Sequence, residues 1–252
     1  MADVMLVHGA FHAGSCWDLV GAALRSHGHR VWAPTLTGLG ERAYLATKTT
    51  DLSAHVREVE ELITFADLPS VVLVGHGYAG MILGVLHDRM PQRIRNLVYL
   101  DGFVPENGEN ALDGFSPLMR AKTHRAAAEH GHGWLVPPPP REVLVGPHAE
   151  ASTWLRSHLR PQPLGTLTQP VRLLFPEVLD CSYVACTGWR SIAALSLERA
   201  RSRGWRIREI PEPHSAMLTA PQTVTREIES AIEAARPMPA VLPPLSAERV
   251  HR

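Results

Sequence analysis

The chain carries no net charge, has few cysteines and lacks any long apolar run, and each of these shortages excludes a class of protein. Its 252 residues include 25 basic and 25 acidic side chains, so the formal net charge is zero. This balance argues against a nucleic-acid groove and against a polybasic membrane surface. No stretch approaches the roughly 18 consecutive apolar residues that a membrane-spanning helix needs. We therefore expect a small-molecule partner, with no nucleic acid and no membrane.

The N-terminus also lacks the pattern of a signal peptide. Residues 1–7 run directly into a strand-like segment, without a basic start or a cleavage site of small residues. The three cysteines, Cys16, Cys181 and Cys186, form no C-x-x-C motif, which favours reduced, buried thiols over a disulfide or a metal site. These features predict a cytoplasmic protein without a cofactor, as a monomer or a homodimer. Abundant arginine beside rare lysine is typical of a GC-rich bacterial coding sequence.

A Gly-rich corner follows a β-branched run in the first third of the chain. Residues 71–74 read Val-Val-Leu-Val, residues 75–80 read Gly-His-Gly-Tyr-Ala-Gly, and an apolar segment of helical length follows. Strand, sharp turn and helix in this order form the scaffold of a nucleophile elbow, in which a strained turn lifts a serine hydroxyl above the sheet. The serine position is Gly77, which has no side chain. The sequence thus predicts an acyl-transfer scaffold without its attacking atom.

Strands and helices alternate along much of the remaining chain. Further strand candidates lie at 4–7, 30–33, 97–100, 182–186 and 205–210. Apolar residues at helical spacing separate most of them. This alternation predicts an α/β fold with a doubly wound, mostly parallel sheet and ligands at the carboxyl ends of its strands.

Between about 106 and 170 the alternation fades into sequence rich in Pro, Gly, His and Ala. We interpret this segment as a lid of helical pieces, in which Trp134 and Trp154 either line a cavity or pack in the core. Residues 1–236 are then one domain. Residues 237–252 are rich in proline and lack periodicity, which predicts a disordered tail.

Five motifs, in order, resemble the α/β-hydrolase superfamily. They are residues 6–12 with Trp17, residues 36–42, the elbow at 75–80, residues 99–105 and residues 214–218. Within the superfamily they are similar to the branch of plant hydroxynitrile lyases, plant methyl esterases and small bacterial relatives. The resemblance covers roughly residues 3–235 and implies an α/β-hydrolase fold with a helical lid.

The resemblance also implies a triad in the order nucleophile, acid, histidine, and an oxyanion hole of backbone N–H groups. The histidine maps to His214 and the N–H groups map to Ala10 and Tyr78. The nucleophile maps to Gly77, and the acid maps to the turn at 187–190, which contains no carboxylate. Two triad positions therefore depart from the pattern, and an acyl-enzyme on an elbow serine is excluded.

His214 is the principal candidate for proton transfer, because imidazole titrates near neutral pH. The alternative is an inherited, hydrogen-bonded histidine without a role. Asp101, which follows the neighbouring strand, either orients His214 or caps its own loop. Glu177 and Asp180 are weaker candidates for the same task.

Other residues are expected around the pocket. The glycine at position 77 enlarges the pocket floor and leaves room for a bulky substrate or for a water molecule. Phe11, His12 and His76 are expected to flank the pocket, although packing is the commoner role for either histidine. Tyr78 is expected to offer its N–H group and to turn its side chain toward the substrate.

These observations favour a cofactor-free, non-hydrolytic enzyme. In this hypothesis His214 moves a proton while backbone N–H groups hold the oxyanion of an apolar carbonyl substrate. Cyclisation, elimination and carbon–carbon cleavage stay open, and a natural-product pathway such as polyketide biosynthesis fits a large apolar lid. One alternative is a catalytically dead, small-molecule-binding protein. The other is an ester or lactone hydrolase in which His214 activates water.

Overall fold

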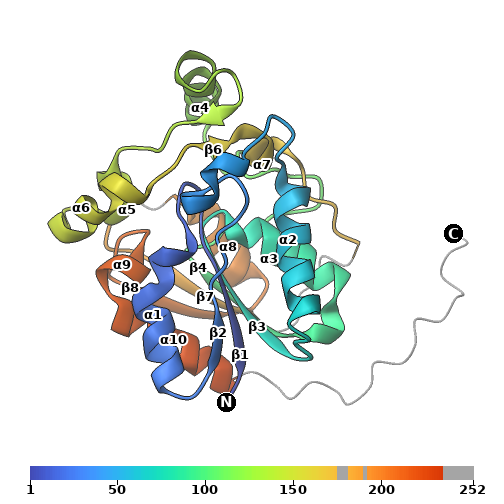
Figure 1. Ribbon diagram of the computed structural model, residues 1–252. Helices are drawn as coiled ribbons and strands as arrows, with labels where there is room; N and C mark the ends of the chain where they lie inside the picture. Colours follow the sequence, from blue (N-terminus) through green and yellow to red (C-terminus); the bar gives the residue numbers. More distant parts are fainter. Residues whose placement is uncertain (175–180, 190–191, 235–252) are drawn as a thin grey trace, which may run out of the picture.

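The computed structural model describes residues 1–174, 181–189 and 192–234, and its centre is a six-stranded sheet (Figure 1). The order is β2-β1-β3-β4-β7-β8, and all neighbouring strands are parallel. The strands are β1 (Asp3–Val7), β2 (Arg30–Trp32), β3 (Val71–His76), β4 (Ile94–Leu100), β7 (Cys181–Cys186) and β8 (Arg206–Ile210). Since the chain winds outward from β1 in both directions, the topological switch point lies between β1 and β3, where open α/β sheets bind ligands.

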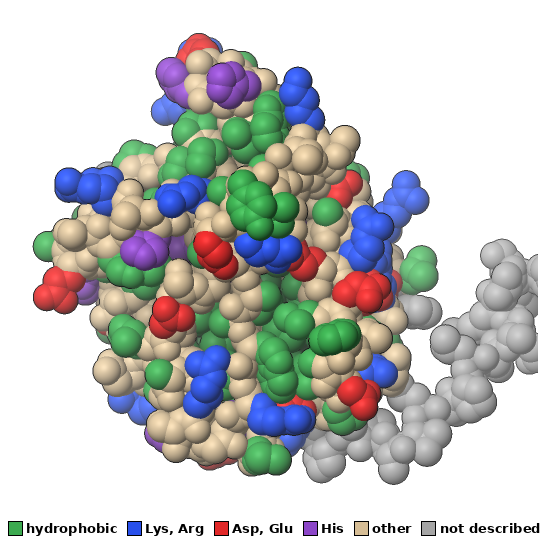
Figure 2. All heavy atoms as spheres, viewed as in Figure 1, with side chains coloured by type: hydrophobic (Ala, Val, Ile, Leu, Met, Phe, Trp, Pro, Cys, Tyr) green, Lys and Arg blue, Asp and Glu red, His purple; other side chains and the backbone are tan. Residues whose placement is uncertain are grey.

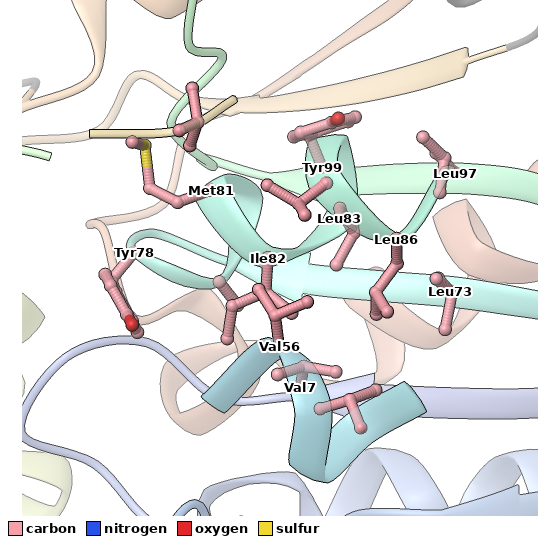
Figure 3. Packing of buried hydrophobic residues seen from close by; sticks show 14 of the residues in the cluster. Val7, Val56, Leu73, Tyr78, Met81, Ile82, Leu83, Leu86, Leu97 and Tyr99 are labelled. Carbon is pink, nitrogen blue, oxygen red and sulfur yellow. The ribbon is translucent and has the colours of Figure 1, made fainter. Parts of the chain in front are cut away.

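Helices cover both faces of this sheet, as the α/β prediction requires (Figure 1). One layer holds α2 (Leu52–Phe65), α3 (Ala79–Arg89) and α8 (Ala194–Ser202), and the other holds α1 (Asp18–Ser26) and α10 (Pro221–Ala234). Strand residues alternate between the two layers with the period of two that a strand dictates. In β1, Met5 and Val7 join the first layer, whereas Val4 and Leu6 join the second. Figure 3 shows the first layer, where side chains of α2, α3 and the strands interdigitate.

The segment predicted as a lid lies beyond the ends of the strands (Figure 1). It contains α4 (Pro117–His130), α5 (Arg141–Val145), α6 (Ala149–His158) and α7 (Leu164–Thr168). It also contains a short antiparallel pair, β5 (Leu135–Val136) with β6 (Gln162–Pro163), which the sequence does not predict because two-residue strands have no periodicity. These elements lie at the edge of the sheet where the loops after β1, β3, β4 and β8 meet.

The remaining elements are short. Within the described residues, the larger elements are connected by helix α9 (Ala216–Thr219) and by three 3₁₀ helices, at Gly14–Trp17, Gly40–Leu45 and Pro91–Arg93. The 3₁₀ turn at Gly14–Trp17 leads directly into α1. The proposed tail at 237–252 and the candidates Glu177 and Asp180 lie outside the described residues.

Surface charge follows the composition. Basic and acidic side chains are interspersed over the face shown in Figure 2.

Cys16, Cys181 and Cys186 are buried thiols. Among the helices that the structure describes, none has the length and apolar character needed to cross a bilayer.

Candidate active site

The candidate site is built from loops that follow four parallel strands. Ala10 follows β1, Gly77 follows β3, Asp101 follows β4 and His214 follows β8. The carboxyl ends of parallel strands meet at one edge of the sheet, so residues distant in sequence come together there.

The elbow itself is fixed by backbone hydrogen bonds to the neighbouring strand. Gly77 has a φ of +51°, in the left-handed region, and its N–H donates to the Leu100 carbonyl at 3.2 Å. The Gly77 carbonyl accepts from the Phe103 N–H at 2.9 Å. A Cβ at Gly80 would lie 2.1 Å from the Phe103 carbonyl oxygen, so α3 approaches this loop only because residue 80 is glycine. The elbow and the Asp101 loop are therefore held as one unit.

Asp101 contacts His214 directly. The Nδ1 atom of His214 lies 2.7 Å from Oδ2 of Asp101, and both side chains are buried. The other carboxylate oxygen accepts from the Cys186 N–H at 3.3 Å. Because a carboxylate only accepts hydrogen bonds, Nδ1 of His214 carries the hydrogen and Nε2 is left as an acceptor. This is the tautomer that a general base requires.

The Nε2 atom of His214 faces the position that a side chain on residue 77 would occupy. A Cβ built on Gly77 would lie 3.0 Å from Nε2 and 3.2 Å from Cε1 of His214. The imidazole thus stands where it would meet a nucleophile on residue 77. A serine there would need the ring to retreat by a few tenths of an ångström.

Two backbone donors remain available beside this position. Within the described parts of the chain, the N–H groups of Ala10 and Tyr78 make no hydrogen bond to another protein group. The N–H of Phe11 is instead engaged, since it donates to Oε1 of Gln162 at 3.0 Å. Phe11 has a φ of +68° and its half-buried ring packs against the core. Of these three N–H groups, those of Ala10 and Tyr78 are without a protein acceptor in the described parts of the chain.

His12 and His76 lie behind His214, where both are buried. The His76 ring centroid is 4.3 Å from that of His214, and its Nε2–H donates to the His214 carbonyl at 3.0 Å. His12 donates from Nδ1 to the Ala10 carbonyl at 2.8 Å and accepts at Nε2 from Ser215 Oγ at 3.2 Å. Both histidines support the backbone around the site and do not reach into it.

These supporting histidines are neutral at pH 7. Burial lowers the pKa of His12 to about 4. It also lowers the pKa of His8, a further buried histidine directly after β1, to about 3. Burial also holds the pKa of His76 well below its usual value. A neutral His76 places no positive charge next to the ring of His214.

The Tyr78 side chain points away from the site, contrary to the prediction. Its ring is part of the core beside α2 and α3 (Figure 3), and its hydroxyl contacts Nδ1 of His55 at 3.0 Å. His55 donates in turn to the Thr37 carbonyl at 2.8 Å. Tyr78 therefore contributes only its backbone to the site.

The lid is tied to the site through contacts that the sequence gives no signal for. Besides the bond from Phe11 to Gln162, the Arg160 N–H donates to the Phe11 carbonyl at 3.0 Å. The Ser215 N–H donates to the Leu144 carbonyl of α5 at 2.8 Å. His214 is 6% exposed under this cover, so its imidazole is largely shielded from bulk solvent. Shielding from bulk solvent strengthens the electrostatic contacts of a buried group.

Two further features of the molecule are its potential metal ligands and its cavities. Within the ranges that the structure describes, no group of three His, Cys, Asp or Glu side chains is arranged to hold a metal ion. A cavity of about 270 Å³ lies elsewhere, between α2, α3 and residues 169–172. Trp154 stacks on His158 in the lid, with ring centroids 3.8 Å apart.

A strand-elbow-helix corner, a histidine paired with a carboxylate and two free backbone donors at one sheet edge define a site of the α/β-hydrolase type. The chain belongs to the alpha/beta hydrolase family, whose model matches residues 4–227.

Relatives of known activity support this assignment. A carbendazim hydrolyzing esterase from Nocardioides sp. (strain SG-4G) is 36% identical over 242 residues, which cover 90% of this chain and 98% of the relative. Methylesterase 8 of Arabidopsis thaliana is 36% identical over 123 residues, covering 46% of this chain and 44% of the relative. The solved structure of an extracellular α/β-hydrolase from a Paenibacillus species has the same fold, with a TM-score of 0.83, 20% identity and coverage of 94% and 100%.

These relatives correct the functional prediction. The expectation of a non-hydrolytic cyclase or lyase is wrong, because the similar proteins are esterases and other hydrolases. The glycine at position 77 of the elbow suggested a change of reaction, but a serine hydroxyl is only one way to deliver a nucleophile to a carbonyl carbon. The hydrolytic alternative fits the relatives better.

Proposed function

We propose that this protein hydrolyses esters or lactones with a water molecule that His214 activates. The observation that carries the proposal is the contact between Asp101 and His214, which leaves Nε2 as an acceptor beside the empty side-chain position of Gly77. A general base in this position takes the proton of an attacking hydroxyl.

The reaction follows from the placement of these groups. Nε2 of His214 accepts a proton from water while the water oxygen attacks the carbonyl carbon, and the carbonyl oxygen becomes an oxyanion. The N–H groups of Ala10 and Tyr78 donate to that oxyanion, and one such donor contributes about 3 kcal/mol to the transition state. The imidazolium, stabilised by Asp101, then returns the proton to the departing alkoxide. Acid and alcohol are released, and no bond to the protein forms.

The substrate class is proposed from the relatives. The Nocardioides relative is named for carbendazim, and the Arabidopsis relative is named as a methylesterase. Carbendazim, methyl esters, aryl acetates and a simple lactone are therefore the substrates to test.

The test compares the unchanged protein with His214→Gln on these substrates. We expect turnover to fall about 10²- to 10⁴-fold, the range that a positioned base contributes. His130→Gln is the matched control, because the side chain of His130 is 69% exposed at the end of α4. A single turnover in ¹⁸O-labelled water should place one label in the acid product, and intact-protein mass spectra should show no added acyl group.

Two results would contradict the proposal. Equal turnover in the unchanged protein and in His214→Gln would show that His214 is not the general base of the reaction. Tight binding of the same compounds without turnover would favour the alternative of a catalytically dead binding protein.

A further inference from the structure

A buried glutamine of the lid, Gln162 in β6, connects the lid to the backbone of the candidate site. Its Oε1 atom accepts from the Phe11 N–H at 3.0 Å, and its Nε2 atom donates to Oγ1 of Thr166 in α7 at 2.6 Å. Both Gln162 and Thr166 are 0% exposed. A backbone N–H can only donate, so the amide oxygen of Gln162 must face Phe11 and the amide nitrogen must face Thr166. The orientation of the Gln162 side chain is therefore fixed at both ends.

Phe11 has a backbone conformation that bulky residues avoid. Its φ is +68°, and a left-handed residue with a side chain persists only where the surrounding contacts impose it. The Phe11 N–H donates to Gln162, and the Phe11 carbonyl accepts from the Arg160 N–H at 3.0 Å. Residues 160 and 162 of the lid thus hold the peptide groups on both sides of Phe11.

The same contact constrains Ala10, whose N–H is one of the two donors without a protein acceptor. The peptide group between Ala10 and Phe11 is held at both ends. Its carbonyl accepts from Nδ1 of His12 at 2.8 Å, and its N–H donates to Gln162. Because this peptide group is fixed, the backbone of Ala10 has little freedom to rotate, and the direction of the Ala10 N–H is restricted with it.

The other end of the Gln162 side chain leads to the second donor. Thr166 also forms a side-chain hydrogen bond with the Tyr78 hydroxyl. Tyr78 supplies the second free N–H, and its buried ring fixes the residue just before α3. The side chains of Tyr78, Thr166 and Gln162 therefore form one hydrogen-bonded connection. It joins the residue that carries one donor to the residue that follows the other.

We propose that Gln162 is a positioning residue for ester hydrolysis, and that it holds the N–H groups of Ala10 and Tyr78 in register with each other. The inference rests on the proposed function, because the spacing of these N–H groups matters for a reaction in which both donate to one oxyanion. Gln162 moves no proton and forms no bond in this reaction. It acts only through the backbone that it holds.

Gln162→Met tests the role directly, because methionine has a similar length and makes neither hydrogen bond. Misplacing a reacting group by about 1 Å costs about 10²-fold in rate, so we expect kcat for phenyl acetate to fall by roughly 10- to 100-fold. KM should change little, because the oxyanion develops in the transition state and is absent from the bound ester. Steady-state kinetics measure both values, and the melting temperature confirms that the variant is folded.

Gln169→Met is the matched control. Gln169 also lies in the lid segment, and its Oε1 atom likewise accepts from a backbone N–H, that of Ser53 at 2.7 Å. This bond joins residue 169 to the first turn of α2 and does not involve Ala10, Phe11 or Tyr78. Its loss should lower the melting temperature and leave kcat unchanged.

Thr166→Val and Thr166→Ser separate hydrogen bonding from packing. Valine keeps the volume of Thr166 and removes the hydroxyl that accepts from Gln162, whereas serine keeps the hydroxyl and removes the methyl group. We expect kcat to fall in Thr166→Val and to stay close to that of the unchanged protein in Thr166→Ser. A role in packing alone would give the opposite order. This pair also decides the question if Gln162→Met does not fold.

The outcomes separate the inference from the function on which it rests. If the unchanged protein hydrolyses the test esters and Gln162→Met keeps its kcat, the positioning role is wrong while the proposed function stands. A kcat that is lower in Thr166→Ser than in Thr166→Val would contradict the role as well, and so would a raised KM with unchanged kcat in Gln162→Met. If the unchanged protein hydrolyses none of the test esters, the proposed function fails and the inference fails with it.

Discussion

Asp101 and His214 are 113 residues apart in the chain, yet Oδ2 of the first lies 2.7 Å from Nδ1 of the second. The family pattern places the acid after β7, where the turn at 187–189 offers no carboxylate. Strand β4 is the direct neighbour of β7, so a residue at the end of β4 reaches the same imidazole. The Cys186 N–H at the end of β7 donates to the other oxygen of Asp101 and holds the carboxylate there. In this structure the carboxylate that contacts His214 therefore comes from the loop after β4 and not from the turn after β7.

Asp101→Asn tests this contact with little disturbance of the backbone. Asp101 has a φ of +44°, a conformation that Asp and Asn tolerate better than other residues with a side chain. The amide cannot stabilise an imidazolium, and it can turn its NH₂ toward Nδ1 and impose the wrong tautomer. We expect ester turnover to fall by roughly 10²- to 10⁴-fold while the melting temperature changes by only a few degrees.

Asp3→Asn is the matched control for Asp101→Asn. Asp3 is also buried, but it begins β1 at the opposite end of the sheet and pairs with Arg30. Its substitution should lower stability and leave turnover unchanged. Equal turnover in Asp101→Asn and in the unchanged protein would show that the carboxylate only shapes its loop.

Gly77→Ser should convert the reaction to a covalent one. Nε2 of His214 already faces the Cβ position, and Asp101 already fixes the tautomer. One substitution therefore completes a triad without a new acid in the turn after β7. We expect a burst of product followed by a slower steady rate, and an intact mass increased by one acyl group.

The comparison with Gly77→Ala separates the effect of a nucleophilic hydroxyl from the effect of added side-chain volume. Both variants place a Cβ 3.0 Å from Nε2 and require the same small retreat of the ring. The alanine variant has no hydroxyl and should show neither burst nor added mass. A serine variant that behaves like the alanine variant would mean that the ring does not retreat to hydrogen-bond distance from Oγ.

The sequence predicts the fold and the principal histidine because both depend on local signals. Short apolar, β-branched runs mark the strands, and the glycines at 75, 77 and 80 mark the elbow. The partner of His214 could not be decided from the sequence, because the choice between Asp101 and the turn after β7 depends on which strands are neighbours. Gln162 gives no signal at all, since its contact with Phe11 spans 151 residues and lies in a segment without periodicity. The functional prediction failed for a related reason: a missing side chain shows which atom is absent and does not show what replaces it.

Gly80→Ala should disturb both folding and activity. The added Cβ would lie 2.1 Å from the carbonyl oxygen of Phe103 and 2.7 Å from its nitrogen, so α3 or the loop after β4 must shift. Overpacking against backbone costs about 3 kcal/mol, and the shifted loop carries Asp101. We expect a lower midpoint of urea unfolding and slower ester turnover.

Gly114→Ala is the control for this change. Gly114 is exposed, and a Cβ there would have no atom within 4 Å. Its unfolding free energy should stay within about 0.5 kcal/mol of that of the unchanged protein. Similar destabilisation in both variants would point to glycine flexibility and not to the contact with Phe103.

The buried histidines make stability depend on pH in a defined direction. Burial lowers the pKa of His8 to about 3 and that of His12 to about 4, from 6.5. Below pH 6.5 the unfolded chain binds protons at these positions and the folded chain does not, so stability is full above pH 6.5 and falls as the pH is lowered toward 4. Each pH unit in this window weakens folding by about 1.4 kcal/mol per histidine, or roughly 2 kcal/mol each between pH 6.5 and 5.

Urea unfolding between pH 7 and 5 measures this slope above the range in which most carboxylates titrate. His12→Gln should lower stability at pH 7 yet flatten the slope, because the amide can bond the Ala10 carbonyl and Ser215 without binding a proton. His130→Gln, at an exposed position, should leave the slope unchanged. A slope that is the same in His12→Gln and in the unchanged protein would show that His12 becomes protonated in the folded state near its ordinary pKa, with the packing around His214 open enough to accept the charge.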